Sequence, residues 1–411
     1  MIDFTHCEID LTSDYGGSDK KIPIVYNNDK YMVKFSDKIP DKKRNSMNSS
    51  YTNSAYSEHI GCEILKTMGF NVQDTLLGTY SMTSSKGEER VYPVVACKNF
   101  NVNGKSFIDF KKIEETFLFK TPKIPKIVDL YDIMNNGNKY FGKEFGKEAL
   151  KAYWDLFIAD GLIGNFDRHA NNWGYFIDNE TKQAELAPIF DCGSSLFPQL
   201  ADDVLSEILN NQKEIQKRVD VFPNAALQDV NGRKISYKEY ISSHQNKDCN
   251  DALIRIYPKI DMDKIYKLID NCNELSDIRK EFYKTILDAR YQQIIKEPYI
   301  QLCDKFKEIQ FSELKNLSKT EKELVHSIIF LNDDVKEIKE NSLSDCVNLT
   351  DVDMSKMIYD YINENFGESF FAGTKIDVNN VHEYNQDQNK ENDNIIVNED
   401  NLIENEEYDD L

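Results

Sequence analysis

The sequence predicts an α+β protein of two lobes, in which a β-rich N-terminal lobe precedes a mainly helical C-terminal lobe. Residues 1–100 contain short β-rich runs separated by turn residues, with a single helical segment among them. From about residue 144 onward, apolar residues recur mainly at helical spacing. The chain has 411 residues, of which 40% are hydrophobic and 11% aromatic, so it can bury a sizeable core.

The N-terminal lobe is expected to hold one sheet and one helix. Its strand-like runs are HCEID, IPIVY, KYMVKF, DTLLGTY and RVYPVVACKNF, and turn-forming groups such as DYGG and NND lie between them. Residues 53–68 change to a helical pattern, because Ala55, Ile60 and Ile64 can share one face. Gly69 follows as a suitable stop for this helix.

The C-terminal lobe is expected to contain a helix over residues 144–163, followed by a loop and a β-hairpin with the sequence WGYFID–NETKQ–AELAPIF. From residue 202 to about 370 the pattern is helical with short loops. Residues 377–411 carry 12 acidic residues and one lysine, a composition typical of a solvated, disordered tail. We therefore expect an N-terminal lobe over 1–100, a C-terminal lobe over 101–300, a helical extension over 301–375 and an acidic tail over 376–411.

Charge and cysteine usage exclude several classes of protein. The net charge is −21, which argues against direct binding of nucleic-acid phosphates or anionic membrane surfaces. No apolar run reaches the roughly 18 residues of a membrane helix, and no signal peptide is visible. We expect a cytoplasmic protein, with export without a signal peptide left open. The eight cysteines form no CxxC pair, which predicts reduced thiols and no zinc site.

The stretch GLIGNFDRHANNWGYFIDNETKQAELAPIFDCGSS gathers many polar residues among apolar ones. Asp167 and Asn172 lie just after the expected helix, and Asp191 follows 19 residues after Asn172, across the hairpin. Phosphoryl transfer to a hydroxyl needs an acceptor for the hydroxyl proton and oxygen ligands for Mg²⁺. Asp167 suits the first role. Asn172 and Asp191 suit the second, because Mg²⁺ prefers carboxylate and carbonyl oxygens.

The N-terminal lobe offers partners for such chemistry. Lys34 ends the strand-like run KYMVKF, and a strand lysine that reaches ATP phosphates is typical of kinases. Glu58, in the only helix of this lobe, could pair with Lys34, and Glu63 on the same helix is the alternative. The group Tyr15-Gly16-Gly17-Ser18 lies between the first two strand-like runs, so Gly16, Gly17 and Ser18 could cover phosphates or simply form a hairpin turn.

Four further residues of the polar stretch have expected roles, and one of them has two. His169 lies between Asp167 and Asn172, where it could contact phosphate during catalysis or hold the loop backbone by hydrogen bonds. Arg168 is expected to pin the same loop. The side chains of Trp173 and Phe190 are expected in the core beneath the hairpin.

The ordered set Lys34, Glu58, NFDRHANNW and LAPIFDCG resembles the HipA-like Ser/Thr kinases, and in particular their shorter bacterial members. The similarity extends over roughly residues 1–300 and includes YNNDKYMVKF, TLLGTY, VVACKNF and NKDCNDALIRIYPKIDM. It implies a two-lobed protein-kinase-like fold and transfer of the γ-phosphate of ATP, with Mg²⁺, to Ser or Thr of a protein. Autophosphorylation is part of this expectation, and the serines near the site are Ser13, Ser18, Ser194 and Ser195.

Residue by residue, the resemblance implies that Asp167 is the catalytic base and Lys34 the ATP-phosphate lysine. It implies that Asn172 and Asp191 are the Mg²⁺ ligands, and that the backbone of Ala96, Cys97 and Lys98 is the hinge that contacts adenine. Full-length HipA proteins carry an extra region ahead of the ATP-binding lobe, whereas this chain enters its first strand at once. We therefore do not expect a DNA-binding antitoxin partner of the HipA type.

Two other functions fit the same residues. The string DRHxxN followed by DxG is similar to the catalytic loop of phosphoinositide kinases, although the acidic charge disfavours a lipid substrate. The other alternative is a nucleotide-binding pseudokinase that acts as a partner module without catalysis.

Overall fold

A computed structural model describes residues 1–12, 21–36, 53–83, 87–118, 125–307 and 317–322. The chain divides into two compact units, Met1–Leu302 and Cys303–Leu411, and the elements that build the site all belong to the first. Gly16, Gly17 and Ser18, most of the expected helical extension and all of the expected acidic tail lie outside the described residues. Within the described ranges, no helix combines the length and apolarity needed to cross a membrane.

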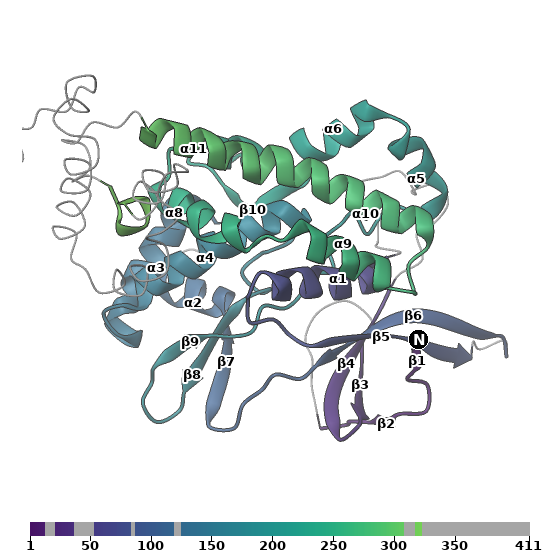
Figure 1. The fold of residues 1–411 in the computed structure, drawn as a ribbon. Helices are drawn as coiled ribbons and strands as arrows, with labels where there is room; N and C mark the ends of the chain where they lie inside the picture. The colour runs from purple at the N-terminus through teal and green to yellow at the C-terminus, as the bar shows by residue number, and fades with distance from the viewer. Residues whose placement is uncertain (13–20, 37–52, 84–86, 119–124, 308–316, 323–411) are drawn as a thin grey trace, which may run out of the picture. The chain divides into compact units, whose positions relative to one another are not determined.

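The N-terminal lobe is built on a six-stranded sheet with the order β1-β5-β6-β4-β3-β2 (Figure 1). β1 runs parallel to β5, and all the other neighbours are antiparallel. The strands are β1 (Ile2–Asp3), β2 (Glu8–Ile9), β3 (Lys21–Tyr26), β4 (Asp29–Phe35), β5 (Thr75–Thr83) and β6 (Glu89–Lys98). The expected strand-like runs are therefore confirmed.

The turn between β3 and β4 fixes the register that places Lys34. Asn27 and Asn28 form a two-residue connection with φ values of 51° and 66°, a left-handed conformation that asparagine tolerates well. Because side chains alternate along a strand, Val33 packs into the core under the sheet while Met32 and Lys34 share the opposite face. Met32 packs against the cluster of Ala55, Val95 and Cys97, so this face of β4 is turned toward the helix of the lobe.

That helix, α1 (Ser54–Thr67), covers the sheet. Its face toward the sheet and the C-terminal lobe is apolar and buried, and includes Ala55, Ile60 and Leu65. The backbone of Gly69 has a φ of 83°, a left-handed conformation that stops the helix as the sequence predicts.

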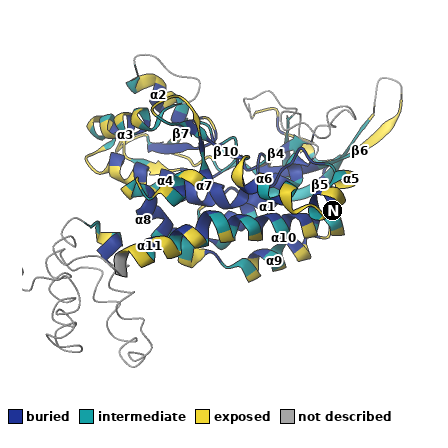
Figure 2. Cartoon of the chain, turned by 90° about the horizontal axis from the view of Figure 1, so that it is seen from above, coloured by how far each residue is buried: buried dark blue, intermediate teal, exposed yellow. Residues whose placement is uncertain are grey.

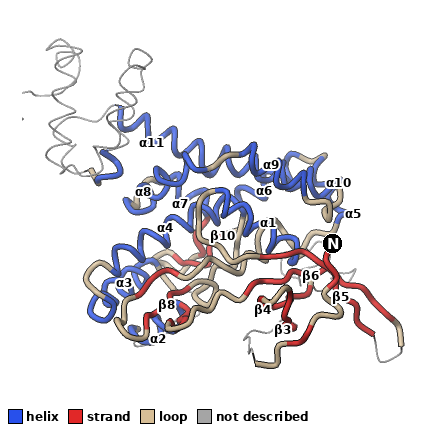
Figure 3. The backbone as a smooth tube through the Cα atoms, turned by 60° about the horizontal axis from the view of Figure 1, so that its bottom comes forward, coloured by secondary structure: helices blue, strands red, loops and turns tan. Residues whose placement is uncertain are grey.

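The C-terminal lobe is mainly helical, and Figure 3 shows its helices on one side of the strands of the N-terminal lobe. Its helices are α2 (Phe110–Phe117), α3 (Ile127–Phe141), α4 (Phe145–Ile163), α5 (Asp202–Leu209), α6 (Gln212–Asp220), α7 (Tyr237–Ser243), α8 (Lys247–Ile256), α9 (Met262–Asn271), α10 (Asp277–Arg290) and α11 (Glu297–Lys307). A 3₁₀ turn, η2 (Tyr257–Lys259), follows α8, and a π-helical stretch, η3 (Tyr291–Lys296), joins α10 to α11.

α4 is the central helix of this lobe, and its last eleven residues are all buried. Figure 2 shows burial concentrated on α4 and its neighbours, while the far ends of β5 and β6 are exposed. The predicted hairpin is confirmed as β8 (Gly174–Asp178) and β9 (Ala184–Leu186). A third strand, β7 (Lys105–Asp109), pairs with β8.

The prediction that the chain is helical from residue 202 onward is wrong over one segment. Strands β10 (Asn224–Gln228) and β11 (Lys234–Ser236) form an antiparallel hairpin there. Its turn includes Asn231 and Gly232, and Gly232 has a φ of 82°. An Asn-Gly pair strongly favours a hairpin turn, so a hairpin forms here although the apolar residues around it have helical spacing.

A buried arginine fixes the end of α4, from which the polar loop of the site departs. Arg290, which is fully buried, donates from Nε at 2.9 Å and from Nη2 at 2.6 Å to the carbonyl oxygen of Gly161, and from Nη1 at 2.7 Å to that of Arg218. The last carbonyls of a helix lack partners within the helix, so this guanidinium acts as a cap supplied from another element.

We predict that Arg290→Met lowers the free energy of unfolding by about 3 kcal/mol, because two buried carbonyl oxygens lose their partners. Urea unfolding followed by circular dichroism measures this loss. Arg233→Met is the matched control, since the Arg233 side chain is 81% exposed and should change stability by less than about 0.5 kcal/mol. Equal stability of the two variants would contradict the proposed capping role.

Candidate functional site

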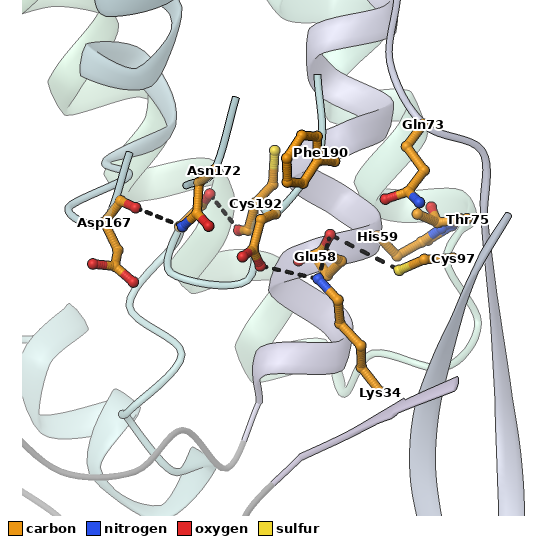
Figure 4. Close-up of polar contacts among 12 residues, drawn as sticks. Lys34, Glu58, His59, Gln73, Thr75, Cys97, Asp167, Asn172, Phe190 and Cys192 are labelled. Carbon is orange, nitrogen blue, oxygen red and sulfur yellow. Dashed lines mark hydrogen bonds and ion pairs between the residues drawn. The ribbon is translucent and has the colours of Figure 1, made fainter. Parts of the chain in front are cut away.

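The two lobes meet at a lysine held between two carboxylates (Figure 4). Lys34 of β4 places its Nζ 3.3 Å from Oε1 of Glu58 on α1 and 3.0 Å from Oδ1 of Asp191. The Glu58 side chain is 1% exposed, and those of Lys34 and Asp191 are 17% and 39% exposed. Glu58 rather than Glu63 is therefore the partner of Lys34, because Glu63 instead pairs with Lys66 at 2.8 Å.

Electrostatic interactions keep the Lys34 ammonium and the Asp191 carboxylate ionised. Burial disfavours the Lys34 ammonium, but the Asp191 and Glu58 carboxylates raise the pKa of Lys34 well above its usual value. Burial acts against the Asp191 carboxylate too, and the Lys34 ammonium nevertheless lowers the pKa of Asp191. Burial dominates at Glu58 and raises its pKa. The site thus holds a fixed positive charge next to a carboxylate that is partly open to solvent.

A loop with several internal hydrogen bonds follows α4. α4 ends at Gly164, whose φ of 67° turns the chain, and Asn165 then accepts a hydrogen bond from the Asp167 amide at 3.0 Å. The Asn172 side chain donates from Nδ2 to the Asp167 carbonyl at 2.8 Å (Figure 4). This bond leaves the carbonyl oxygen of the Asn172 amide for another partner.

Arg168 joins this loop to the segment after β9 that carries Asp191. Its guanidinium binds both carboxylate oxygens of Asp160, at 2.9 Å and 3.2 Å, and both side chains are almost fully buried. Its Nη1 donates to the Asn172 carbonyl at 2.9 Å and to the Phe190 carbonyl. Asn172 and the residue before Asp191 are therefore held by one guanidinium, which is the loop-pinning role expected of Arg168. Asp160 was not anticipated; its sequence signal is a lone carboxylate within the apolar run FIADGLI.

The backbone at Asp191 has an unusual conformation and is closely packed by α1. Asp191 has a φ of 60°, which is uncommon for a residue with a side chain. α1 approaches the DCG segment closely, since a Cβ on Gly61 would lie 2.9 Å from the Cβ of Cys192. A Cβ on Gly193 would lie 3.0 Å from Oε2 of Glu58. Small residues at 61 and 193 thus allow the helix that carries Glu58 to pack directly on the segment that carries Asp191.

The remaining predicted site residues lie as follows. His169 is 43% exposed, its Nε2 lies 3.8 Å from Oδ2 of Asp167, and its Nδ1 accepts from the Asn171 amide at 3.2 Å. Ala96, Cys97 and Lys98 form the end of β6, between β4 and β5. The thiol of Cys97 lies 3.9 Å from Oε1 of Glu58.

The candidate serines and the two aromatic residues beside the hairpin lie as follows. Ser194 and Ser195 are buried, and the Ser195 hydroxyl donates to the Cys192 carbonyl at 2.6 Å. Ser13 and Ser18 lie outside the described residues.

The two aromatic residues expected in the core differ in burial. Trp173 is buried as expected and stacks on Phe110, with ring centroids 4.1 Å apart. Phe190 is half-buried and packs against Phe100 and Phe107.

The donor set has the chemistry of a hydrated magnesium site. In the part of the chain that the structure describes, no group of three or more His, Cys, Asp and Glu residues is arranged to hold a metal. One carboxylate and one amide oxygen, from Asp191 and Asn172, suit an ion that keeps waters and takes phosphate oxygens as its other ligands.

Comparison with known proteins gives concordant matches. Residues 13–247 match the model of the HipA-like C-terminal domain family. The serine/threonine-protein kinase CtkA of Helicobacter pylori strain J99 is 42% identical over 297 residues, which are 72% of this chain and 86% of the relative. A crystal structure of an H. pylori proinflammatory kinase CtkA superposes with a TM-score of 0.64 at 41% identity, over 73% of this chain and 97% of that one.

A solved complex of HipA, HipB and operator DNA from Shewanella oneidensis MR-1 is 16% identical over 70% of this chain and 67% of the matched chain. Its TM-score of 0.42 is too low to bear on fold or partners. The match to the CtkA structure confirms both the predicted two-lobed fold and the resemblance that the sequence motifs carry.

We predict that Arg168→Leu lowers the free energy of unfolding by about 3–5 kcal/mol, because it leaves the buried Asp160 carboxylate without its countercharge. Adding Asp160→Asn removes that charge and should recover a substantial part of the loss. Urea unfolding of the two single variants and the double variant gives the coupling energy. Simple addition of the two single effects would contradict a direct ion pair.

Proposed function

Because the chain belongs to the family of HipA-like C-terminal domains and is a serine/threonine-protein kinase, we propose that it binds ATP with Mg²⁺ and transfers the γ-phosphate to Ser or Thr hydroxyls, including its own. The observation that carries the proposal is the contact of Lys34 with both Glu58 and Asp191, near the loop in which the Asn172 side chain is bonded to Asp167 (Figure 4). A kinase needs this combination of one fixed cation and oxygen ligands to position the phosphates.

Each residue of the cluster has a distinct part in the proposal. Lys34 binds the phosphates of ATP, and Glu58 keeps its ammonium in place from the buried side. Asn172 and Asp191 hold Mg²⁺, which neutralises charge on the phosphates when it is bound. The amide oxygen of Asn172 is available for this because its Nδ2 is already bonded to the loop.

Asp167 is proposed as the base that accepts the proton of the acceptor hydroxyl. Its side chain is 47% exposed, so an incoming hydroxyl can reach it. Burial raises the pKa of this carboxyl and the nearby Asp191 carboxylate raises it further, which makes Asp167 a better proton acceptor than an ordinary surface aspartate. His169 is proposed to hold the loop and to orient Asp167 rather than to exchange protons.

The remaining residues of the proposed nucleotide site are assigned from the resemblance to the family. Ala96, Cys97 and Lys98 are proposed as the hinge beside adenine, and Gly16, Gly17 and Ser18 as the backbone that covers the phosphates. The Gln73 side chain, from the segment before β5, donates to the Lys98 carbonyl at 2.8 Å, which supports a fixed backbone at the proposed hinge. A protein hydroxyl is the proposed acceptor, and we propose that the protein acts in the cytoplasm.

We predict that Asp191→Asn abolishes phosphoryl transfer and weakens Mg·ATP binding, whereas Asp167→Asn abolishes transfer but leaves nucleotide binding nearly intact. The first change removes a ligand of the bound ion, and the second removes only the proton acceptor. Intact-mass spectrometry after incubation with Mg·ATP counts added phosphates, and calorimetric titration gives the affinity. Asp132→Asn, an exposed position on α3, is the control and should behave as wild type.

Each outcome of this experiment has a defined meaning. Self-labelling of Asp167→Asn at the wild-type rate would remove Asp167 from the base role. Nucleotide binding by the wild type without any ADP product would favour the pseudokinase. Transfer to phosphoinositide vesicles but not to casein or to the chain itself would favour the lipid kinase.

A further inference from the structure

An apolar pocket lies next to the segments that carry the two proposed metal ligands. Its walls come from α4, from β9 and the residues that follow it, and from Trp173. Trp173 directly follows Asn172, and Ile189, another wall residue, lies two residues before Asp191. The pocket has a volume of about 170 Å³, and none of the described residues proposed to bind ATP or Mg²⁺ is part of its lining. It is therefore a site separate from the proposed nucleotide site.

The walls of this pocket are mostly apolar and are fixed in place. The apolar lining residues are Phe70, Ala152, Leu156, Trp173, Leu186, Ala187 and Ile189. The Ile189 amide donates to the Asn71 carbonyl at 2.8 Å, and the Ile189 carbonyl accepts from the Gln73 amide at 2.9 Å. An apolar cavity of roughly 150 Å³ binds benzene. The pocket thus has room for one six-membered ring with a small substituent.

A lysine with spare hydrogen-bonding capacity lies at the edge of this apolar pocket. Among the described residues that line it, only Lys151 and Asp155 are charged. The Lys151 side chain is 56% exposed, and its Nζ donates to Oδ2 of Asp155 at 2.8 Å. Arg255 binds the other oxygen of the same carboxylate, from Nε at 2.9 Å and from Nη2 at 2.7 Å. Asp155 is thus shared by two cations, and the Lys151 ammonium, which has three donors, can also bind an anion.

We propose that this pocket binds a small aromatic carboxylate, with its ring among the apolar side chains and its carboxylate on the Lys151 ammonium. Ligand pockets of this kind combine apolar walls with a few polar groups that orient the ligand. Trp173 and Phe70 favour an aromatic ring, because aromatic pairs gain energy beyond the area that they bury. The ammonium selects an anion, since a hydrogen bond between two charged groups is stronger than one between neutral groups.

The test uses benzoate as the probe, benzamide as its uncharged counterpart and acetate as a carboxylate without a ring. Trp154 and Trp173 are the two tryptophans of the chain, and of these only Trp173 lines the pocket. The indole N–H signals of the ¹⁵N-labelled full-length chain therefore report on the site, and Trp173→Phe assigns them. We expect benzoate to shift the Trp173 signal and not the Trp154 signal, with a Kd of about 0.1–1 mM. Benzamide and acetate should bind at least about fivefold more weakly.

Two variants of α4 test the proposed contacts. Lys151→Met removes the charge but keeps an apolar stem, so benzoate affinity should fall about 5- to 10-fold while benzamide affinity stays the same. Lys147→Met is the matched control, because Lys147 is exposed one turn earlier on α4 and does not line the pocket; it should bind benzoate as wild type. Ala152→Leu fills the pocket and should abolish binding of both probes. Lys151→Met changes only an exposed side chain and so tests the proposal even if Ala152→Leu does not fold.

Three results would overturn this inference. Benzoate could leave the Trp173 signal unmoved at 20 mM, or it could bind Lys151→Met and Lys147→Met equally well, which would show attraction to the general charge of α4. Displacement of benzoate by saturating Mg·ATP would place the probe at Lys34 instead. Retention of benzoate in the presence of Mg·ATP, with the expected loss in Lys151→Met alone, would support the separate site, whether or not the chain transfers phosphate.

Discussion

The ion pair between Arg168 and Asp160 is the interaction on which the site depends. Two opposite charges with almost no exposure are stable in a protein interior only when their geometry is good and their remaining hydrogen-bonding groups are satisfied. Arg168 meets this condition by binding Asp160 through two bonds and by donating to two backbone carbonyls. Those carbonyls are those of Asn172 and of Phe190, the residue before Asp191, so one side chain sets the spacing of the two proposed metal ligands.

The contact between the lobes connects the site to the sheet of the N-terminal lobe. Register and alternation place Lys34 on the face of β4 that looks toward α1, and the small residues Gly61 and Gly193 let α1 pack directly on the DCG segment. Glu58 is thereby buried between Lys34 and the segment of Asp191. Backbone geometry and close packing, rather than any single strong bond, bring these three side chains together.

Much of this arrangement is predictable from the sequence because its signals are local. Strand alternation, the Asn-Asn turn and the stop at Gly69 define the N-terminal lobe, and the spacing of Asp167, Asn172 and Asp191 is the basis of the proposed chemistry. The choice between Glu58 and Glu63 is harder from sequence alone. Glu58 lies three residues after Ala55 and four before Cys62, on the face of α1 that is buried, and that helical phase is the signal that favours it.

Other features depend on long-range packing and could not be predicted. The role of Asp160 requires knowing that Arg168 turns back toward α4, and the cap of α4 comes from Arg290, which lies 129 residues from Gly161. The β10–β11 hairpin was hidden because its Asn-Gly turn lies within a segment of mainly helical spacing. The hinge and the phosphate-covering glycines remain predictions from the family.

The bond between Lys34 and Asp191 has a thermodynamic consequence for ligand binding. A triphosphate that arrives alone must compete with the carboxylate for the ammonium, and it also meets the negative charge of Asp191. In the proposed function, a divalent ion that arrives with it would bind Asp191 and free the lysine for the phosphates. Ion and nucleotide would then bind with positive cooperativity, and by linkage each would increase the affinity of the other by the same factor.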